Sequence, residues 1–537
     1  MLPDPPEPAA PRAVNATRQA GIVGLAVMAS RVLGLARDLI IAALFGASRS
    51  LDAFLIAFRI PNLLRDLFAE GALSTAFVTV FTQKITTDGD ESAWKLASKV
   101  TTIITVFMSA VVLLGILFAP LLVRLQAPGF APDDVVFTTV LLRIMYPFIL
   151  LVSLAALVMG MLNARRIFGV PAMASSFFNL GSIIGGVSLG WWIDPTFGPR
   201  SLIGLALGTL IGGLCQLGVQ LPTLRKEGFR FRFDWDTRDS GVRRVIALMI
   251  PAIIAGSAVQ VNVVVNGIFA SYQEGAISWL QYAFRLMQLP LGVFGVAIAT
   301  VTLPLVSRSA ALGDRGEFRA ILARGLRLAF FLTIPSAIGL ICLAEPIIGL
   351  IFERGRFDHR ATVETAAALR FYAIGLAAYA GLKVLAPAFY ALDQRRTPMY
   401  VSLVSIGVNL GLNAALAIGL GWGHRGLALS TSIVATLNFA ILYVLMRRLA
   451  GGLETRQFAH GLARLAVAAA GLAIFCFAAE RLVLKDFFLW ALPVKIPALV
   501  GVIACGGGLF FASCYLLHVP EMRETIDLLS RRLRRGK

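Results

Sequence analysis

This 537-residue sequence contains unusually little charge. Charged residues make up 15% of it, whereas a soluble globular chain carries about a quarter. Hydrophobic residues make up 58%, and fourteen stretches reach the length of about 20 mostly apolar residues that a membrane-spanning helix needs. These stretches are 20–46, 51–84, 99–125, 134–163, 170–193, 200–223, 243–271, 277–307, 320–344, 362–391, 398–420, 425–446, 460–482 and 496–517. The composition therefore predicts an all-α polytopic membrane protein.

Residues that build catalytic and metal sites are also scarce. The five cysteines lie in apolar stretches without a Cys-x-x-Cys pair, and the four histidines are not clustered. This pattern argues against a disulfide framework or a metal centre. There is no phosphate-binding Walker loop, so the chain is not expected to hydrolyse ATP. We expect a transporter without a cofactor, driven by a Na⁺ or H⁺ gradient, by the membrane potential or by removal of its cargo.

Acidic residues are outnumbered, with 30 Asp and Glu against 49 Lys and Arg. Most of the basic residues fall in the even-numbered loops and at the two ends, which is the positive-inside pattern. We therefore expect both termini to be cytoplasmic, and the net charge of +19 to report topology and not a nucleic-acid site. The proline-rich start, 1–19, is expected to be disordered and lacks the features of a signal peptide. The end, 518–537, is expected to be a basic cytoplasmic tail.

A smaller group of basic residues lies within the apolar stretches, where an isolated charge costs at least ~2.5–3.5 kcal/mol. These residues are Arg31, Arg37, Arg59, Arg65, Arg143, Arg285, Arg370 and Lys383. The nearby acids are fewer, namely Asp38, Asp52, Asp66 and Glu70. Arginine binds phosphate bidentately. The surplus therefore predicts a cationic interior for an anionic, phosphate-bearing cargo.

The sequence contains an internal repeat. The triplet Ala-Phe-Arg occurs at 57–59 and 283–285, and later matches keep nearly the same spacing, with offsets of 226, 230 and 222 residues. This period covers six predicted helices, so the halves should be related by an axis along the membrane normal, with a site between them. We predict an N-terminal lobe at 20–223, a basic cytoplasmic linker at 224–242 and a C-terminal lobe at 243–449. Helices 13 and 14 follow at 450–517.

The intramembrane charges allow more than one interpretation. Asp38 lies seven residues after Arg31, and Arg59 lies seven after Asp52, so each pair shares a helix face and could be a structural tie. Arg65 and Arg285 have no such partner along their helices, which makes them the strongest candidates for phosphate contacts. Three further basic residues are assigned less sharply. Arg143 and Arg370 either snorkel to an interface or line the interior, and Lys383 is a candidate cavity residue.

Several short motifs together resemble those of the MurJ/MviN family. They are 30–38 (SRVLGLARD), 52–54 (DAF), 61–65 (PNLLR), 68–72 (FAEGA), 290–297 (PLGVFGVA), 352–357 (FERGRF) and 385–390 (LAPAFY). This family belongs to the multidrug/oligosaccharidyl-lipid/polysaccharide exporter superfamily. The resemblance implies flipping of lipid II, the undecaprenyl-pyrophosphate-linked peptidoglycan precursor, across the bacterial cytoplasmic membrane by alternating access. It also implies two six-helix lobes around a central cavity, and two final helices that form a groove for the lipid tail.

The resemblance also assigns roles to individual residues. It carries over Arg31, Arg37, Asp52, Arg65 and Arg285 as important charges, and Arg59 and Glu70 as cavity or gate residues. From the charge pattern and the resemblance together we predict cargo contacts for Arg31, Arg37, Arg59, Arg65 and Arg285, and cavity or gate positions for Asp38, Asp52, Asp66, Glu70 and Lys383. The chain departs from the family at Phe284 and Gln288, where relatives often carry an acid. Some relatives use sodium in the C-terminal lobe, but the corresponding helices here offer amides and hydroxyls without a carboxylate.

Three rival functions remain open at this point. A flippase for another undecaprenyl-pyrophosphate-linked oligosaccharide would need the same cationic interior. A cation-coupled drug antiporter should show buried acids unopposed by arginine, and a non-transporting scaffold of cell-wall synthesis needs no intramembrane arginine. The net basic interior argues against the antiporter, and the intramembrane arginines argue against the scaffold. The resemblance implies that the cargo is lipid II, and we expect the chain to act as a monomer with lipid II and the surrounding membrane lipids as its partners.

Overall fold

The computed structural model describes residues 13–522, and these residues form helices and connecting turns without a β-strand. The side chains of 13–20, 22, 69–72, 252, 254–256, 258, 259, 456 and 457 lie outside this description. So do most of the predicted N-terminal lead-in and most of the basic tail. The helices of the first half are α1 (Ala13–Phe45), α2 (Arg49–Leu64), η1 (Arg65–Leu73), α3 (Ser74–Leu117), α4 (Ala119–Gln126), α5 (Pro132–Met145), α6 (Phe148–Ala164), α7 (Gly169–Ile193), η2 (Pro199–Ser201), α8 (Leu202–Gly218) and α9 (Leu221–Lys226).

The second half continues in the same way. Its helices are α10 (Ser240–Ala270), α11 (Ala276–Pro290), η3 (Leu291–Val296), α12 (Ala297–Ala311), α13 (Arg315–Cys342), α14 (Ala344–Phe352), α15 (His359–Ile374), α16 (Leu376–Ala391), α17 (Arg396–Asn413), η4 (Ala414–Gly419), α18 (Gly423–Ala450), α19 (Thr455–Leu482), η5 (Phe487–Leu489) and α20 (Leu492–Leu516). The segments η1, η3 and η4 are π-helices, and η2 and η5 are 3₁₀ turns.

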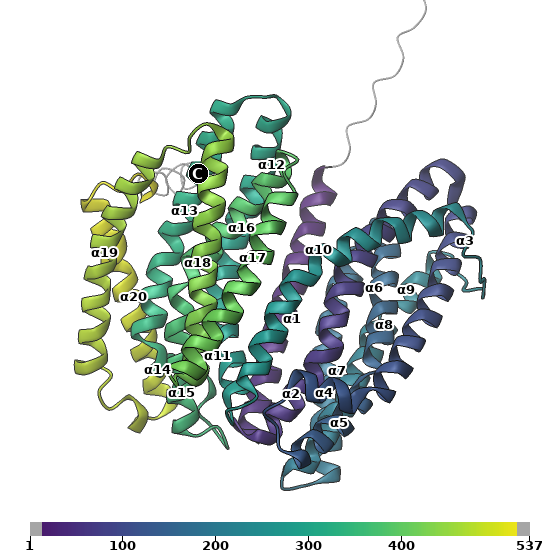
Figure 1. Cartoon of the computed structure of the whole chain (residues 1–537), viewed down its shortest axis with the longest axis horizontal. Helices are drawn as coiled ribbons and strands as arrows, with labels where there is room; N and C mark the ends of the chain where they lie inside the picture. Colours follow the sequence, from purple (N-terminus) through teal and green to yellow (C-terminus); the bar gives the residue numbers. More distant parts are fainter. Residues whose placement is uncertain (1–12, 523–537) are drawn as a thin grey trace, which may run out of the picture. The chain divides into compact units, whose positions relative to one another are not determined.

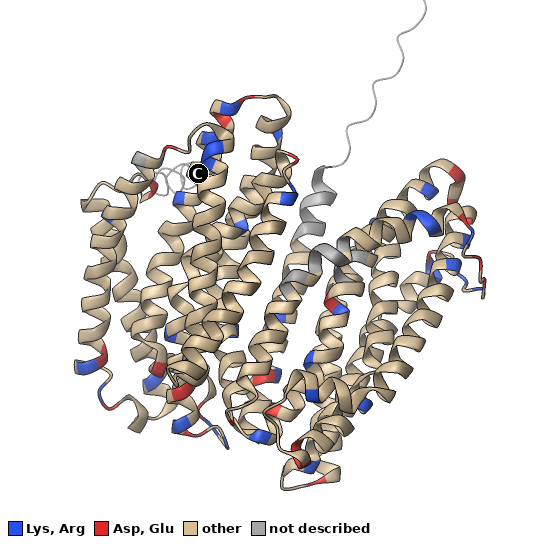
Figure 2. Cartoon of the chain, viewed as in Figure 1, with Lys and Arg blue, Asp and Glu red and all other residues tan. Residues whose placement is uncertain are grey.

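Ten described helical segments are long and apolar enough to cross a membrane. The pair α15 and α16, which meet at 44°, makes up to eleven. Of the three predicted stretches that remain, 20–46 and 243–271 fall on α1 and α10, whereas 51–84 covers α2, η1 and the first part of α3. Helices therefore occupy all fourteen predicted stretches, and the all-α fold is confirmed, while the number of crossings stays a prediction. Most charged residues lie near the helix ends (Figure 2).

The chain divides into two compact units (Figure 1). Unit 1 contains Met1–Ile41, Ala53–Leu125 and Ala131–Ser257. Unit 2 contains Ala42–Asp52, Gln126–Phe130 and Ala258–Lys537. The linker predicted at 224–242 thus belongs to unit 1, whereas the turn between α1 and α2 belongs to unit 2.

Glycines hold α7 and α8 of unit 1 in close contact. A Cβ atom at Gly208 of α8 would overlap the Gly186 backbone of α7, and one at Gly204 would overlap the Gly190 backbone. Small residues at helix contacts let two backbones approach closely, and packing of this kind stabilises helix pairs in lipid. These contacts position α7, whose Phe178 and Asn179 face α1.

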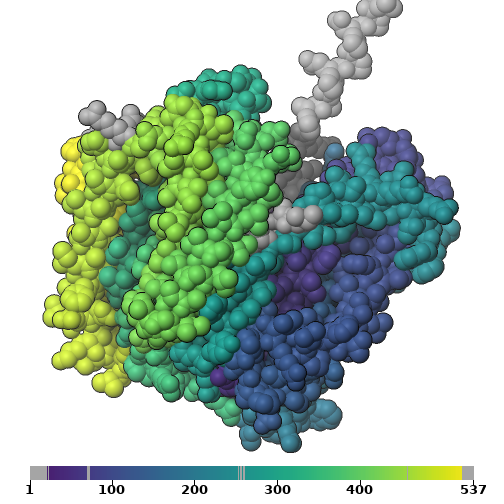
Figure 3. Space-filling model, viewed as in Figure 1, coloured from purple at the N-terminus to yellow at the C-terminus, as the bar shows by residue number. Residues whose placement is uncertain are grey.

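The final two helices pack on one flank of unit 2, shown in yellow in Figure 3. Leu472 of α19 and Phe510 of α20 share a buried cluster with Phe331 of α13. Arg327 of α13 joins this layer through ion pairs with Glu454 at 2.9 Å and Glu521 at 2.9 Å. Apolar packing and these ion pairs together attach α19 and α20 to the rest of the unit.

Both halves contain a π-helix at the same position of the repeat. The first begins at Arg65 and the second at Leu291, which are 226 residues apart, the offset found in the sequence. A proline lies shortly before each, at Pro61 and Pro290. Proline removes a backbone donor, and π-helical turns accommodate such interruptions, often at functional sites. The second helix of each repeat is therefore interrupted by the same kind of local structure.

Candidate functional site

The first helix presents two of the predicted arginines in unit 1. Arg31 is exposed, whereas the Arg37 side chain is 19% exposed. The Nε and Nη2 atoms of Arg37 both donate to Oδ1 of the buried Asp38 at 3.3 Å. The Arg37 guanidinium also lies 5.8 Å from the ring centre of Phe178 on α7. The acid and the aromatic ring together fix the direction of this guanidinium, because a cation is attracted to both.

The second helix supplies Arg59 and Arg65. Arg59 is half-buried on α2, and Arg65 is the first residue of the π-helix η1. Arg65 Nη2 lies 3.0 Å from Asp66 Oδ1, and its Nε donates to the same oxygen at 3.3 Å. Arg65 thus has no partner seven residues away along its helix but pairs with the adjacent residue. Both side chains remain partly accessible, at 23% and 34%.

Arg285 of unit 2 occupies the position that corresponds to Arg59 of unit 1, and it lies on α11 before η3. It is half-buried and interacts with its surroundings. Its neighbour Phe284, where an acid was expected from the resemblance, packs edge-on against Tyr372 of α15 with 5.3 Å between ring centres. The departure at Phe284 therefore replaces an acid with an aromatic contact.

Asp52, predicted to belong to the cavity or a gate, is fully buried within unit 2 at the start of α11. Its Oδ2 accepts a hydrogen bond from Gly275 N at 2.7 Å. Its Oδ1 accepts two from Ser278, from the backbone N at 2.9 Å and from Oγ at 2.7 Å. A tie to Arg59 along α2 is therefore not what satisfies this carboxylate. Asp52 acts as an N-terminal cap for α11, because it accepts donors that the first turn of a helix leaves unpaired.

Arg143 and Arg370 make the same contact in the two halves. Arg143 Nε donates to the carbonyl of Ile116, one residue before the end of α3, at 3.2 Å. Arg370 Nε donates to the carbonyl of Ile341, one residue before the end of α13, at 3.3 Å. Carbonyls in the last turn of a helix lack intrahelical partners. The two arginines thus cap equivalent helices. This role was not predicted from the sequence, although the separation of Arg143 and Arg370 is close to the repeat offset.

Arg370 also makes ion pairs. Its Nη2 lies 3.0 Å from Glu345 and 4.0 Å from Glu480 of α19. Lys383, by contrast, is exposed on α16. The side chain of Glu70 lies outside the described residues, so its predicted role is not examined by the structure.

A cluster of amides joins α10, α17 and α18 in unit 2. Asn409 Nδ2 donates to Asn262 Oδ1 at 2.9 Å, and Asn413 Nδ2 donates to Asn266 Oδ1 at 2.8 Å. Asn266 Nδ2 in turn donates to Thr431 Oγ1 at 3.2 Å. All of these groups are neutral, and they bond to one another. Asn409 corresponds to Asn179 of unit 1, which donates to the Ser30 carbonyl of α1 at 3.2 Å, so both repeats use this asparagine between the same pair of helices.

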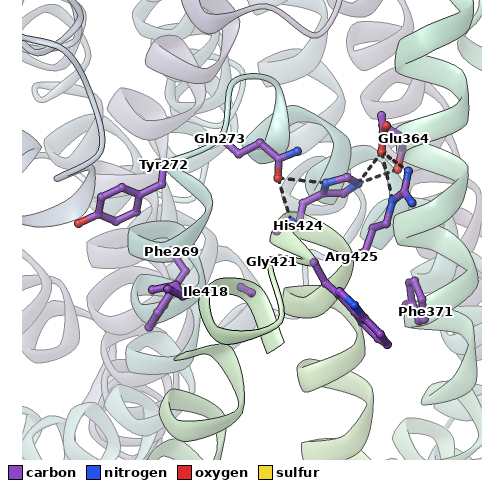
Figure 4. A pocket seen from close by; sticks show the side chains of 12 residues that line it. Phe269, Tyr272, Gln273, Glu364, Phe371, Ile418, Gly421, His424 and Arg425 are labelled. Carbon is purple, nitrogen blue, oxygen red and sulfur yellow. Dashed lines mark hydrogen bonds and ion pairs between the residues drawn. The ribbon is translucent and has the colours of Figure 1, made fainter. Parts of the chain in front are cut away.

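Unit 2 also contains a cavity of about 600 Å³ bounded by the end of α10, α15 and the start of α18 (Figure 4). Its polar side chains bond to one another. Gln273 Oε1 lies 3.2 Å from His424 Nδ1, and Arg425 Nη2 lies 2.9 Å from Glu364 Oε2. The one arginine and the one glutamate of the lining balance in charge. This cavity therefore lacks the surplus of positive charge that a phosphate site needs. Among all the described residues, no group of three or more His, Cys, Asp and Glu side chains could hold a metal ion.

The sequence of this chain matches a known family. The sequence profile described as "Lipid II flippase MurJ" matches residues 41–497. The chain belongs to the MurJ family. A Vibrio cholerae (serotype O1, strain ATCC 39315 / El Tor Inaba N16961) protein named "Probable lipid II flippase MurJ" is 34% identical over 511 residues, covering 93% of this chain and 95% of that protein.

Solved structures agree with this assignment. One titled "Lipid II flippase MurJ, inward closed conformation" has a TM-score of 0.74 at 27% identity, and the match covers 92% of this chain and 99% of that one. A multidrug resistance MATE family transporter of the MOP superfamily shares the fold with a TM-score of 0.67 at 13% identity over 79% of this chain and 96% of that one. The family and transporter class predicted from the motifs are confirmed. The roles of the individual MurJ-type arginines stay predictions.

Proposed function

We propose that this chain moves lipid II from the cytoplasmic to the periplasmic leaflet of the bacterial cytoplasmic membrane by alternating access, as a step of cell-wall synthesis. Lipid II is a disaccharide-peptide linked through pyrophosphate to undecaprenol. The observation that carries the proposal is membership of the MurJ family over 41–497. The arginines of α1, α2 and α11 support it, because ionisable residues at bilayer depth are rare and often mark the path of a polar substrate.

Within unit 1, we assign the pyrophosphate contacts to Arg31, Arg37, Arg59 and Arg65. Arg37 and Arg65 are each paired with the acid that follows them, and each uses two of its nitrogens on a single carboxylate oxygen. A pyrophosphate carries more negative charge than one carboxylate and offers several acceptor oxygens. It can therefore replace the acid as the partner of a guanidinium through bidentate, charge-assisted bonds. Arg285 is the corresponding candidate in unit 2.

We propose that the membrane potential contributes to transport. An anion that moves outward is favoured by an inside-negative potential, by about 2.3 kcal/mol per charge for each 100 mV. The neutral amide cluster of α10, α17 and α18 supports this choice over sodium coupling, because its groups bond to one another and contain no carboxylate. In proteoliposomes we expect flipping to respond to an imposed potassium diffusion potential and not to a sodium gradient.

The proposal includes the orientation of the chain in the membrane and its oligomeric state. Both termini are cytoplasmic, since the basic residues gather in the even-numbered loops and at the ends. We propose that a single chain is the working unit. A cysteine-accessibility assay on both termini tests the orientation, and single-molecule photobleaching in nanodiscs tests the monomer.

The decisive experiment uses cells depleted of this protein and of any second flippase. A periplasmic enzyme that cleaves only flipped lipid II reports on the outer leaflet. We expect lipid II to be protected after depletion, and cleavage to return with the wild type but not with Arg65→Ala or Arg285→Ala. Arg315→Ala, which removes an exposed arginine of unit 2, is the matched control and should restore cleavage.

Membrane insertion of each variant is checked by its amount in the membrane fraction. Normal cleavage in depleted cells would remove lipid II as the cargo. The alternative is then a flippase for another undecaprenyl-pyrophosphate-linked oligosaccharide, for which the same cells should accumulate that lipid in the inner leaflet. Full activity of Arg65→Ala would show that Arg65 is not a required pyrophosphate contact. Lipid II would remain the proposed cargo.

A further inference from the structure

The chain between α9 and α10, residues 228–239, forms a strap without helix or strand in unit 1. It lies beside α3 and carries both charge signs (Figures 1 and 2). Lys99 of α3 holds its second half, because the Lys99 ammonium donates to Asp236 and to Asp239 at 2.9 Å each. Thr102, almost one turn further along α3, accepts from the Asp234 backbone N at 3.2 Å.

The first half of the strap is fixed by an aromatic contact. Phe229 is buried, and its ring lies 5.5 Å from that of Trp94 on α3. Arg165 closes this end, because it pairs with Asp90 of α3 at 2.8 Å and with Glu227 at 3.2 Å. The strap is therefore held along α3 from Asp90 to Thr102, a rise of about 18 Å at 1.5 Å per residue.

The attachment points locate the strap with respect to the bilayer. Lys99 is the last charged residue of α3, and residues 100–117 contain none. This uncharged run is about 27 Å long, close to the ~30 Å of a hydrocarbon core. Lys99 and Thr102 therefore lie where the hydrocarbon region begins, and the strap between Asp90 and Thr102 lies at the level of the lipid headgroups.

The outer side of the strap is aromatic and basic. Phe231, Phe233 and Trp235 are 52%, 72% and 53% exposed. Arg230, Arg232 and Arg238 are exposed too. Of the three acids of the strap, Asp236 and Asp239 are paired with Lys99 and Asp234 is half-buried, so the exposed charges of the strap are positive. Large exposed aromatics are unfavourable in water, but they are enriched at membrane interfaces, where arginine also meets anionic headgroups.

We propose that the strap is an interfacial anchor that binds anionic phospholipid headgroups beside α3. The aromatic side chains enter the headgroup layer and the arginines contact lipid phosphates, while the ion pairs to Lys99 keep the strap at this depth. The inference rests on the proposed function only for placing the strap at the cytoplasmic leaflet. Its tests measure lipid contact and not transport, so an inactive flippase can still pass them, and an active one can fail them.

The first test measures the depth of Trp235. The full-length protein is reconstituted with lipids brominated either near the headgroup or near the end of the acyl chain, and the tryptophan emission of wild type and Trp235→Phe is compared. We expect the emission that Trp235 contributes to be quenched more strongly by the shallow bromine. Trp94→Phe is the matched control, because Trp94 is covered by Phe229 and Arg165 and its contribution should change less. An unquenched Trp235, or one quenched more by the deep bromine, overturns the proposal.

The second test measures lipid preference. Nanodiscs contain phosphatidylethanolamine and phosphatidylglycerol, and the lipids that stay with the protein are counted by native mass spectrometry. The variant Arg230→Gln/Arg232→Gln/Arg238→Gln should lose phosphatidylglycerol enrichment, by up to about fivefold per arginine. The control Arg315→Gln/Arg395→Gln/Arg396→Gln removes the same charge from exposed positions of unit 2. Equal losses in the two triple variants, or no loss in the first, contradict the proposal and leave an acidic protein as the partner to seek.

Discussion

The carboxylate of Asp52 accepts two hydrogen bonds from Ser278, the residue 226 positions later that occupies the same place in the second repeat. Asp52 of the first repeat thus caps α11, the second helix of the second repeat. The equivalent position of the second repeat carries Ser278 in place of an acid. The acid is fully buried, and both of its oxygens are used. Asp52 therefore stabilises unit 2, and we expect it to make no direct contact with the cargo.

Replacing Asp52 should destabilise the protein without removing a cargo contact. Asp52→Ala leaves the Gly275 and Ser278 donors unpaired, and the loss of a helix cap costs roughly 0.5–2 kcal/mol of unfolding free energy. We expect a lower melting temperature in detergent, together with near-normal flipping per folded molecule. Glu91→Ala, at an acid of α3 that is 85% exposed, is the control and should change stability little. A stable but inactive Asp52→Ala protein would return Asp52 to the transport machinery.

The equivalent arginines Arg143 and Arg370 should differ in their contribution to stability. Arg143→Met removes one hydrogen bond to the Ile116 carbonyl, which we expect to cost about 1 kcal/mol. Arg370→Met also leaves Glu345 without its 3.0 Å partner, and should cost about 1–3 kcal/mol. The double variant Arg370→Met/Glu345→Gln should recover part of this loss. Equal melting temperatures for the two single variants would contradict the difference.

The contact between α7 and α8 can be tested with two glycines of one helix. Gly208→Ala places a methyl group against the Gly186 backbone, and such overpacking costs about 1–3 kcal/mol of unfolding free energy. Gly218→Ala has open space around it and should be neutral or slightly stabilising, because alanine is the better helix former. The melting temperatures of both variants, measured by thermal unfolding, test this difference in stability. A stable Gly208→Ala protein would show that the helices can separate without loss.

We expect transport to require Arg65 but not the negative charge of Asp66. Asp66→Asn keeps the Arg65 guanidinium charged and frees it from a full negative charge at 3.0 Å, so we expect flipping to continue. Arg65→Ala should abolish it. The lipid II cleavage assay compares the two variants, with Arg65→Lys testing whether charge alone is enough. If Asp66→Asn is as inactive as Arg65→Ala, the ion pair itself is required.

The strap should loosen in acid. Hydrogen bonds from Lys99 lower the pKa of Asp236 below its usual 3.8. Burial would raise the pKa of Asp239, but the hydrogen bonds from Lys99 and from the backbone of Val242 and Gly241 lower it below 3.8. A carboxyl with a depressed pKa in the folded state contributes stability above its unfolded pKa, and this is lost as the pH falls through the folded value.

The protection of residues 228–239 from hydrogen exchange should therefore be constant above pH 3.8 and fall below it. Lys99→Met removes the cation that lowers both pKa values. Its strap should be less protected at neutral pH, and the difference from wild type should shrink in acid. The same dependence on pH in both proteins would show that other contacts hold the strap.

Patterns local to the chain predicted most of the fold. Apolar runs of bilayer length coincide with the helices, since a backbone in lipid must satisfy its polar groups within each helix. The repeat offset of 226 residues also separates the starts of the two π-helices, and a proline lies shortly before each of them, at Pro61 and Pro290. The motifs around Arg31, Arg65 and Arg285 were specific enough to predict the family, which the comparisons confirmed.

The partners of individual charges could not be predicted in this way. Spacing along a helix suggested a tie between Asp52 and Arg59, yet Asp52 caps a helix more than 220 residues away. Arg143 and Arg370 were left between snorkelling and the interior, and packing set them against the last carbonyls of α3 and α13. The sequence alone determined the helices, the repeat and the family, because these depend on the local order of apolar and polar residues. Only the tertiary structure decided which charge meets which group, because those partners come from distant segments and the packing of whole helices brings them together.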